Sequence, residues 1–213
     1  MSPSTREKIL DATTELLWQQ SYGAVSVDEI CKEASVKKGS FYHYFPSKVD
    51  VVIESFERQW EMSRPFFDEI FSPSLKPLDR LKKLCDAAYE RQKEKAEKYG
   101  KVLGCPYMAC GSELSTQDER IRQKMDELFG RTSKYYESLI RDARAEGLTS
   151  ATNAKIMGQE MQSYIAGVMY QAKIKNDLEV IRRDLFPGLL RFFDRYKPTK
   201  TKTDRSVKKT ADA

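Results

Sequence analysis

The stretch SVDEICKEASVKKGSFYHYFPSKVDVV, residues 26–52, decides the fold of the first quarter of the chain. Ser26 with Glu29 three positions later forms a capping-box pattern, which predicts that a short helix begins here. A second short helix is expected over residues 38–44, because Pro46 steers the residue before it away from helical angles. Two short helices joined by a turn of about four residues, with an alanine near their crossing, indicate a helix-turn-helix.

The second of these helices carries two sets of aromatic side chains. Phe41 and Phe45 lie four positions apart and share one helical face, so we expect them to pack inward together with Tyr44. Tyr42 and His43 fall on another face and are expected to point outward. In helix-turn-helix proteins the N-terminal part of such a helix reaches the base edges of DNA.

Local charge singles out the same region. Residues 36–48 contain Lys37, Lys38 and Lys48 and no acidic side chain, although residues 1–50 as a whole carry a net charge of −1. Lysines, serine hydroxyls and free backbone amides at helix starts are the groups that contact DNA phosphates. The pattern therefore predicts a surface that phosphates approach.

The stretch resembles the DNA-binding domain of TetR-family transcriptional regulators (AcrR-like). The family pattern Gly-x-Phe-Tyr-x-Tyr-Phe-x-x-Lys runs from Gly39 to Lys48, after Ile30 and Ala34, and the likeness covers roughly residues 5–53. The resemblance implies a divergent helical C-terminal domain that binds a small molecule and forms a homodimer. It also implies contacts with double-stranded DNA from Lys37, Lys38, Gly39, Ser40, Tyr42, His43 and Lys48, and a phosphate contact from Ser26.

Apolar residues recur every three or four positions along almost the whole chain, which predicts an all-α fold of about nine helices. Helices are expected over residues 4–23, 26–34, 38–44, 47–71, from after Pro77 to 99, 118–146, 153–175 and 178–196, with a kink or break at Pro187-Gly188. Gly147 is expected to cap one of them. We divide the chain into a helix-turn-helix domain (1–50), a helical ligand-binding and dimerisation domain (51–196) and a disordered basic tail (197–213).

Composition excludes several classes of function. The 213 residues carry a net charge of +5, of which the tail supplies +4. No apolar run approaches the roughly 18 residues of a spanning helix and no secretion signal is present, so we expect a cytoplasmic protein without membrane contact. Four scattered cysteines fit a reducing compartment. With a single histidine, His43, and no phosphate-binding loop or nucleophile motif, the sequence predicts no metal, no cofactor and no catalysis.

The C-terminal half is dense in aromatic and methionine side chains, which suggests an apolar cavity for a small-molecule effector between helices. Each of these side chains taken alone is also compatible with ordinary core. The pocket is expected to involve Trp60, Phe67, Tyr89, Met108, Met125, Phe129, Tyr136, Met161 and Tyr164.

The last two helical segments have broad apolar faces, and the resemblance implies that they pair in the dimer. A two-fold dimer would place its recognition helices in successive major grooves, which predicts a palindromic or pseudo-palindromic operator.

These features together predict a ligand-responsive regulator, a repressor rather than an activator, that a small apolar or aromatic molecule releases from its operator. The fourth helix, 47–71, belongs to both halves and is expected to transmit the response. Two alternatives remain open. Cys105 and Cys110 could form a redox sensor, although their spacing places them about 140° apart around a helix. The chain could also be a helical enzyme or adaptor that shares the fold.

Overall fold

The computed structural model describes residues 3–195, and within this range the chain forms nine α-helices and no strand. The helices are α1 (Thr5–Gln19), α2 (Val27–Glu33), α3 (Lys38–Tyr44), α4 (Lys48–Ile70), α5 (Pro77–Tyr99), α6 (Pro106–Leu114), α7 (Glu119–Ala145), α8 (Ala154–Lys175) and α9 (Glu179–Arg195). The all-α prediction and the expected number of helices are confirmed. The predicted basic tail, 197–213, lies outside the described residues.

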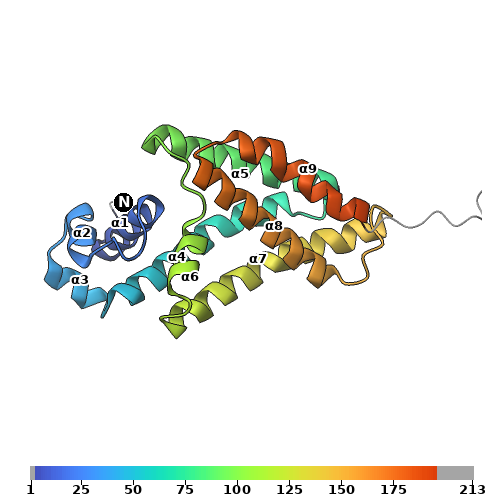
Figure 1. Ribbon diagram of the computed structural model, residues 1–213. Coiled ribbons are helices and arrows are strands. Elements are labelled where there is room, and N and C mark those ends of the chain that lie inside the picture. The colour runs from blue at the N-terminus through green and yellow to red at the C-terminus, as the bar shows by residue number, and fades with distance from the viewer. Residues whose placement is uncertain (1–2, 196–213) are drawn as a thin grey trace, which may run out of the picture.

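Helices α1 to α3 form a small unit from which α4 runs into a larger bundle (Figure 1). The predicted caps begin these helices: Ser4 and Glu7 form a capping box at α1, and Ser26 and Glu29 form one at α2. The expectation that α1 reaches Gly23 is wrong. Gln20 already adopts extended backbone angles, so the helix ends at Gln19.

Two hydrophobic clusters hold the molecule together. One consists of α1, α2, α3 and the start of α4, joined by Cys110 and Leu114 of α6 and by several residues from the first half of α7. The other is built mainly from α5, α7, α8 and α9. Phe67 of α4 and Tyr135 of α7 pack against both clusters. Helices α6 and α7 therefore contribute directly to the core under the helix-turn-helix.

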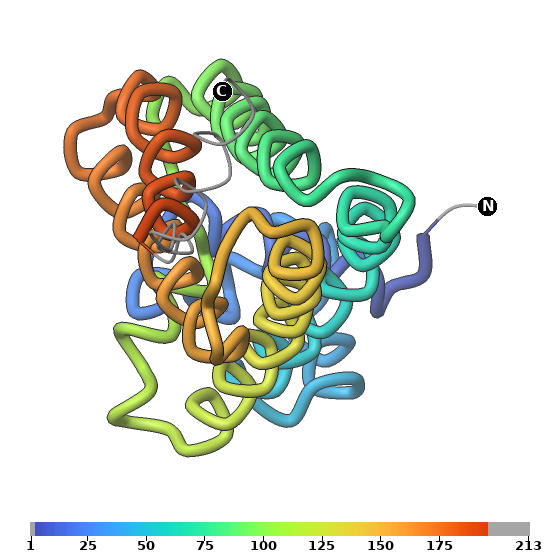
Figure 2. Tube along the Cα trace, turned by 90° about the vertical axis from the view of Figure 1, so that its right-hand side faces the viewer, coloured from blue at the N-terminus to red at the C-terminus, as the bar shows by residue number. Residues whose placement is uncertain are grey.

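Helices α8 and α9 pack side by side at one edge of the bundle (Figure 2). Of the kink or break predicted at Pro187-Gly188, the break is wrong, because α9 continues through both residues. The Tyr164 hydroxyl lies against this turn and donates to the Asp184 carbonyl at 2.8 Å. A Cβ at residue 188 would stand 1.8 Å from that hydroxyl, so the glycine makes room for the α8–α9 contact.

The C-terminal end of α7 has the cap that the sequence predicts. Gly147 has φ 72°, and the Leu148 amide donates to the Ala143 carbonyl at 2.9 Å. Such a left-handed residue after a helix favours glycine, which has no Cβ to clash. No helix within residues 3–195 combines the length and the hydropathy needed to cross a bilayer.

Candidate functional site

The turn between α2 and α3 is a tight C-terminal cap. The Ser35 amide donates to the Lys32 carbonyl at 3.1 Å, and the Val36 amide donates to the Cys31 carbonyl at 2.9 Å. These two bonds form a Schellman motif, with Ser35 in the left-handed position at φ 55°. The motif fixes the angle at which α3 leaves α2, and it confirms the predicted helix-turn-helix.

The two faces of α3 are distinct. Phe41 and Phe45 are fully buried, whereas Tyr42 is 49% exposed and His43 is also exposed, as predicted. The expectation that Tyr44 is a core residue is wrong, because it is 39% exposed. Its ring stands edge-on to His43 at 4.9 Å. The backbone turns extended at Phe45, so Phe45 enters the core and leaves Tyr44 outside.

The three lysines of the predicted phosphate surface have different environments. Lys37 is exposed at the start of α3. The Lys38 ammonium lies 2.9 Å from an Asp28 carboxylate oxygen in α2, and their hydrogen bond raises the pKa of Lys38. The stretch free of acidic residues in sequence therefore has a carboxylate beside it in space.

Lys48 ties the start of α4 to the loop between α1 and α2. Its ammonium donates to the carbonyls of Tyr22 and Val25 at 3.0 and 2.8 Å and lies 3.7 Å from the centre of the Tyr22 ring. Partial burial lowers the pKa of Lys48. Two of its three hydrogens are therefore directed into the protein, so its first role is to hold the helix-turn-helix together.

Gly39, Ser40 and Ser26 complete the predicted DNA-contacting set. Gly39 is exposed within α3, and a Cβ added to it would meet no atom within 4 Å. Ser40 is half-buried in the first turn. The Ser26 hydroxyl accepts from the Glu29 amide at 3.1 Å and donates to the Glu29 carboxylate at 2.8 Å, so it caps α2.

Glu113 of α6 also holds the loop between α1 and α2. Its carboxylate accepts hydrogen bonds from the Tyr22 amide at 3.0 Å and from the Gly23 amide at 2.7 Å. This role could not be predicted from the sequence, because a glutamate some 90 positions away carries no local sign of its partners. The loop is thus held from α4 by Lys48 and from α6 by Glu113.

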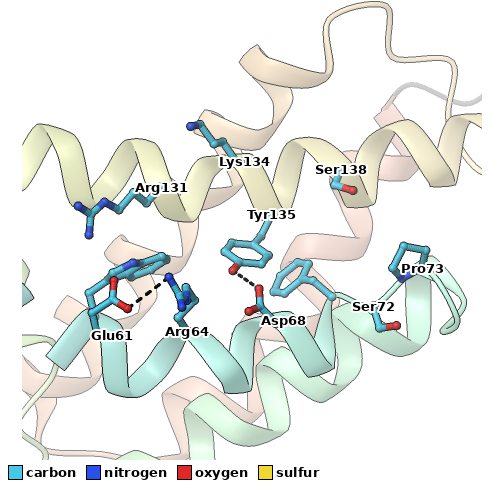
Figure 3. A pocket seen from close by; sticks show the side chains of 11 residues that line it. Glu61, Arg64, Asp68, Ser72, Pro73, Arg131, Lys134, Tyr135 and Ser138 are labelled. Carbon is cyan, nitrogen blue, oxygen red and sulfur yellow. Dashed lines mark hydrogen bonds and ion pairs between the residues drawn. The ribbon is translucent and has the colours of Figure 1, made fainter. Parts of the chain in front are cut away.

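A cleft of about 650 Å³ lies between α4 and α7, open to solvent (Figure 3). Aromatic rings of Trp60, Phe71 and Tyr135 form its apolar wall, with Tyr135 and Trp60 centred 6.3 Å apart. The Tyr135 hydroxyl donates to the Asp68 carboxylate across the cleft. Burial, reinforced by this bond, raises the pKa of Tyr135 to about 12.

Comparison with known proteins gives the helix-turn-helix its context. Residues 9–54 match the family described as "Bacterial regulatory proteins, tetR family", and residues 77–185 match "Tetracyclin repressor-like, C-terminal domain". An HTH-type transcriptional regulator in the lacX 3' region of Lactococcus lactis is 30% identical over 84% of this chain and 88% of its own length. The chain belongs to the TetR family.

Other TetR-family relatives agree over most of the chain. The transcriptional regulator AcuR of Cereibacter sphaeroides is 28% identical over 92% of this chain and 86% of its own length. The crystal structure of regulatory protein TetR from Rhodobacter sphaeroides has a TM-score of 0.76 at 26% identity and covers 89% of this chain and 97% of its own. The family and these relatives are regulators rather than enzymes.

The side chains predicted to line the effector pocket are not gathered at the α4–α7 cleft. Trp60 is the one member of the set that lines the α4–α7 cleft of this TetR-family protein, and Phe67 packs behind it at 5.7 Å. The others are distributed between the cores, two smaller clefts and the surface: Met125, Tyr136 and Met161 are buried, Tyr89 and Tyr164 line separate clefts beside α9, Met108 is half-buried, and Phe129 is 37% exposed.

All four cysteines are free thiols. Burial raises the pKa of Cys85 and of Cys110 to about 12, and burial also raises the pKa of Cys105, the residue before α6. A protonated thiol is a poor nucleophile. These environments disfavour the thiolate that the redox alternative requires.

Proposed function

We propose that this chain is a dimeric repressor that binds a pseudo-palindromic operator through α3 and is released by a small aromatic effector. The observation that carries the DNA-binding part is the outer surface of α3. Exposed Tyr42 and His43 stand beside Lys37 and the bare backbone of Gly39, on a helix whose other face is fully buried. Such a helix can enter a major groove, where aromatic and polar side chains contact base edges.

The outer face of α8 supports dimerisation through the last two helices. Ile156, Tyr170 and Ile174 are all more than half exposed. Their spacing of fourteen and then four residues places them on one side of the helix, since each residue turns about 100°. Exposed apolar side chains on one face of a helix are available for contact with a partner. An interface between two copies there would present two α3 helices to DNA.

Helix α4 links the effector cleft to α3. It begins at Lys48, separated from the end of α3 by three residues. Trp60 in its second half and Phe71, the residue after its end, both line the cleft between α4 and α7. A molecule that binds more tightly when α4 has moved relative to α7 must weaken the DNA-binding arrangement by the same free energy. A regulator with this role acts in the cytoplasm, where its DNA lies.

The proposal is tested with purified protein and labelled DNA from upstream of its own gene. Binding should weaken steeply with salt. Lys37→Ala should reduce the magnitude of the slope of log K against log salt concentration by about 1, which corresponds to the loss of one phosphate contact. Lys83→Ala on α5, which is also exposed, makes the same change in net charge away from α3 and should leave the slope unchanged. Equal slopes for the two variants would remove α3 from the phosphate interface.

A further inference from the structure

The charges that line the α4–α7 cleft are mostly positive. Arg64 of α4 and Arg131 and Lys134 of α7 line it together with two carboxylates, Glu61 and Asp68. Both carboxylates are already engaged, since Glu61 lies 3.3 Å from the Arg64 guanidinium and Asp68 accepts from the Tyr135 hydroxyl. Lys134 has no ion-pair partner among residues 3–195. The cleft therefore offers an added anion a positive charge that is unpaired within the described residues, whereas both negative charges are already engaged.

Arg131 belongs both to the cleft and to the tie between its two helices. Its guanidinium donates to the Glu57 carboxylate of α4 at 2.8 Å and also to Glu127 of its own helix. The same guanidinium lies 5.9 Å from the centre of the Trp60 ring, at the edge of the cleft. Glu57 has a second partner, the Lys124 ammonium at 3.0 Å, which does not line the cleft.

We propose that the effector is an aromatic carboxylate whose ring lies against Trp60 and Tyr135 and whose carboxylate takes Arg131 from Glu57. This inference rests on the proposed function and names the ligand class of its cleft. A carboxylate matches the planar, two-pronged guanidinium, and an aromatic ring gains from contact with the other rings. The cleft volume of about 650 Å³ is ample for such a molecule.

The exchange connects binding to the output helix. While Arg131 bonds to Glu57, α4 is tied to α7 at the level where α4 approaches the helix-turn-helix. A ligand carboxylate on Arg131 removes this bond and leaves Lys124 as the remaining α7 partner of Glu57. Bound ligand therefore favours conformations in which α4 is held to α7 less tightly, and tight α4–α7 pairing disfavours the ligand.

The test uses three probes with one carbon skeleton: 3-phenylpropanoate, the neutral 3-phenylpropanamide and the cationic 3-phenylpropylamine. Each is titrated into the full chain, free of DNA, by calorimetry. The carboxylate should bind at least tenfold more tightly than the amide and the amine. Preference for the amine, equal binding of all three, or no binding of any probe would overturn the proposal.

Variants then locate the carboxylate. Arg131→Gln should reduce the affinity for 3-phenylpropanoate at least tenfold, while the affinity for 3-phenylpropanamide changes less than twofold. An unchanged circular dichroism spectrum serves as the folding check. Glu57→Gln removes the carboxylate that competes with the ligand for Arg131 and should tighten 3-phenylpropanoate binding severalfold. Lys124→Gln removes the other partner of Glu57 outside the cleft and should not tighten it. If both variants, or neither of them, bound 3-phenylpropanoate more tightly, the ligand would not be competing with Glu57 for Arg131.

Operator binding and ligand class are tested by separate experiments. Because the titrations need no DNA, carboxylate selectivity in a chain that binds no operator would overturn the proposed function and leave the ligand class standing. Operator binding with no carboxylate preference would do the reverse.

Discussion

Gly39 offers a clear separation between stability and function. It is exposed in α3, lacks the positive φ that would require glycine, and leaves open space where a Cβ would stand. Glycine within a helix costs roughly 0.5–1 kcal/mol relative to alanine. Gly39→Ala should therefore raise the free energy of unfolding by about that amount. For a chain of this length the midpoint should rise by about 1–4 °C.

The same substitution should weaken operator binding, because a methyl group would stand where the bare backbone is expected to meet DNA. Thermal unfolding and fluorescence anisotropy with labelled operator measure the two effects. Gly130→Ala is the matched control: it is also an exposed helical glycine with open space at its Cβ, but it lies on α7. It should stabilise the protein and leave DNA affinity unchanged. Equal DNA affinity of Gly39→Ala and wild type would show that the backbone at Gly39 does not approach DNA.

Three further predictions concern the ties within the fold. Asp142→Ala removes the carboxylate that lies 2.6 Å from the almost fully buried Arg80 guanidinium. The free energy of unfolding, measured by urea titration, should fall by about 3 kcal/mol. A loss below about 1 kcal/mol would show that the pair is dispensable. Glu113→Ala leaves the backbone amides of Tyr22 and Gly23 without their acceptor. The free energy of unfolding should fall by about 2 kcal/mol, and hydrogen exchange at both amides should become faster. Neither change would occur if α6 did not hold the loop. A hydrogen bond from the Arg131 guanidinium holds the pKa of Glu57 below its ordinary value of 4.5. The stability that Glu57 adds over Glu57→Gln should therefore be constant well above pH 4.5 and be lost as pH falls through the lowered pKa. A stability difference that does not shrink as pH falls below 4.5 would contradict this prediction.

Features that depend on local sequence could be predicted. The capping boxes at Ser4 and Ser26 and the left-handed cap at Gly147 involve residues three to five positions apart, and the structure has them. Burial of Phe41 and Phe45 followed from their spacing. Tyr44 failed the same reasoning because the helix ends there, and a periodic pattern does not reveal where the backbone leaves helical angles.

Features that depend on tertiary contacts could not be predicted. Asp28 is ten residues from Lys38 and belongs to another helix, so the sequence did not show that this lysine is paired. Glu113 and the loop it holds are far apart in the chain. The predicted pocket residues were chosen by type, and buried methionines and tyrosines serve equally well as core. The observed cleft depends instead on which side chains α4 and α7 turn towards each other, including charged ones such as Arg131.

The central claim is that α3 reads DNA sequence through its exposed aromatic face. The direct measurement is the ratio of affinities for DNA from upstream of the gene and for a scrambled duplex of equal length, determined for wild type and for Tyr42→Ala at one salt concentration. We expect a ratio of at least about 1,000 for wild type and a loss of at least tenfold in that ratio for Tyr42→Ala, with affinity for scrambled DNA little changed. Equal binding of the two duplexes by the wild type, or an unchanged ratio in the variant, would contradict it.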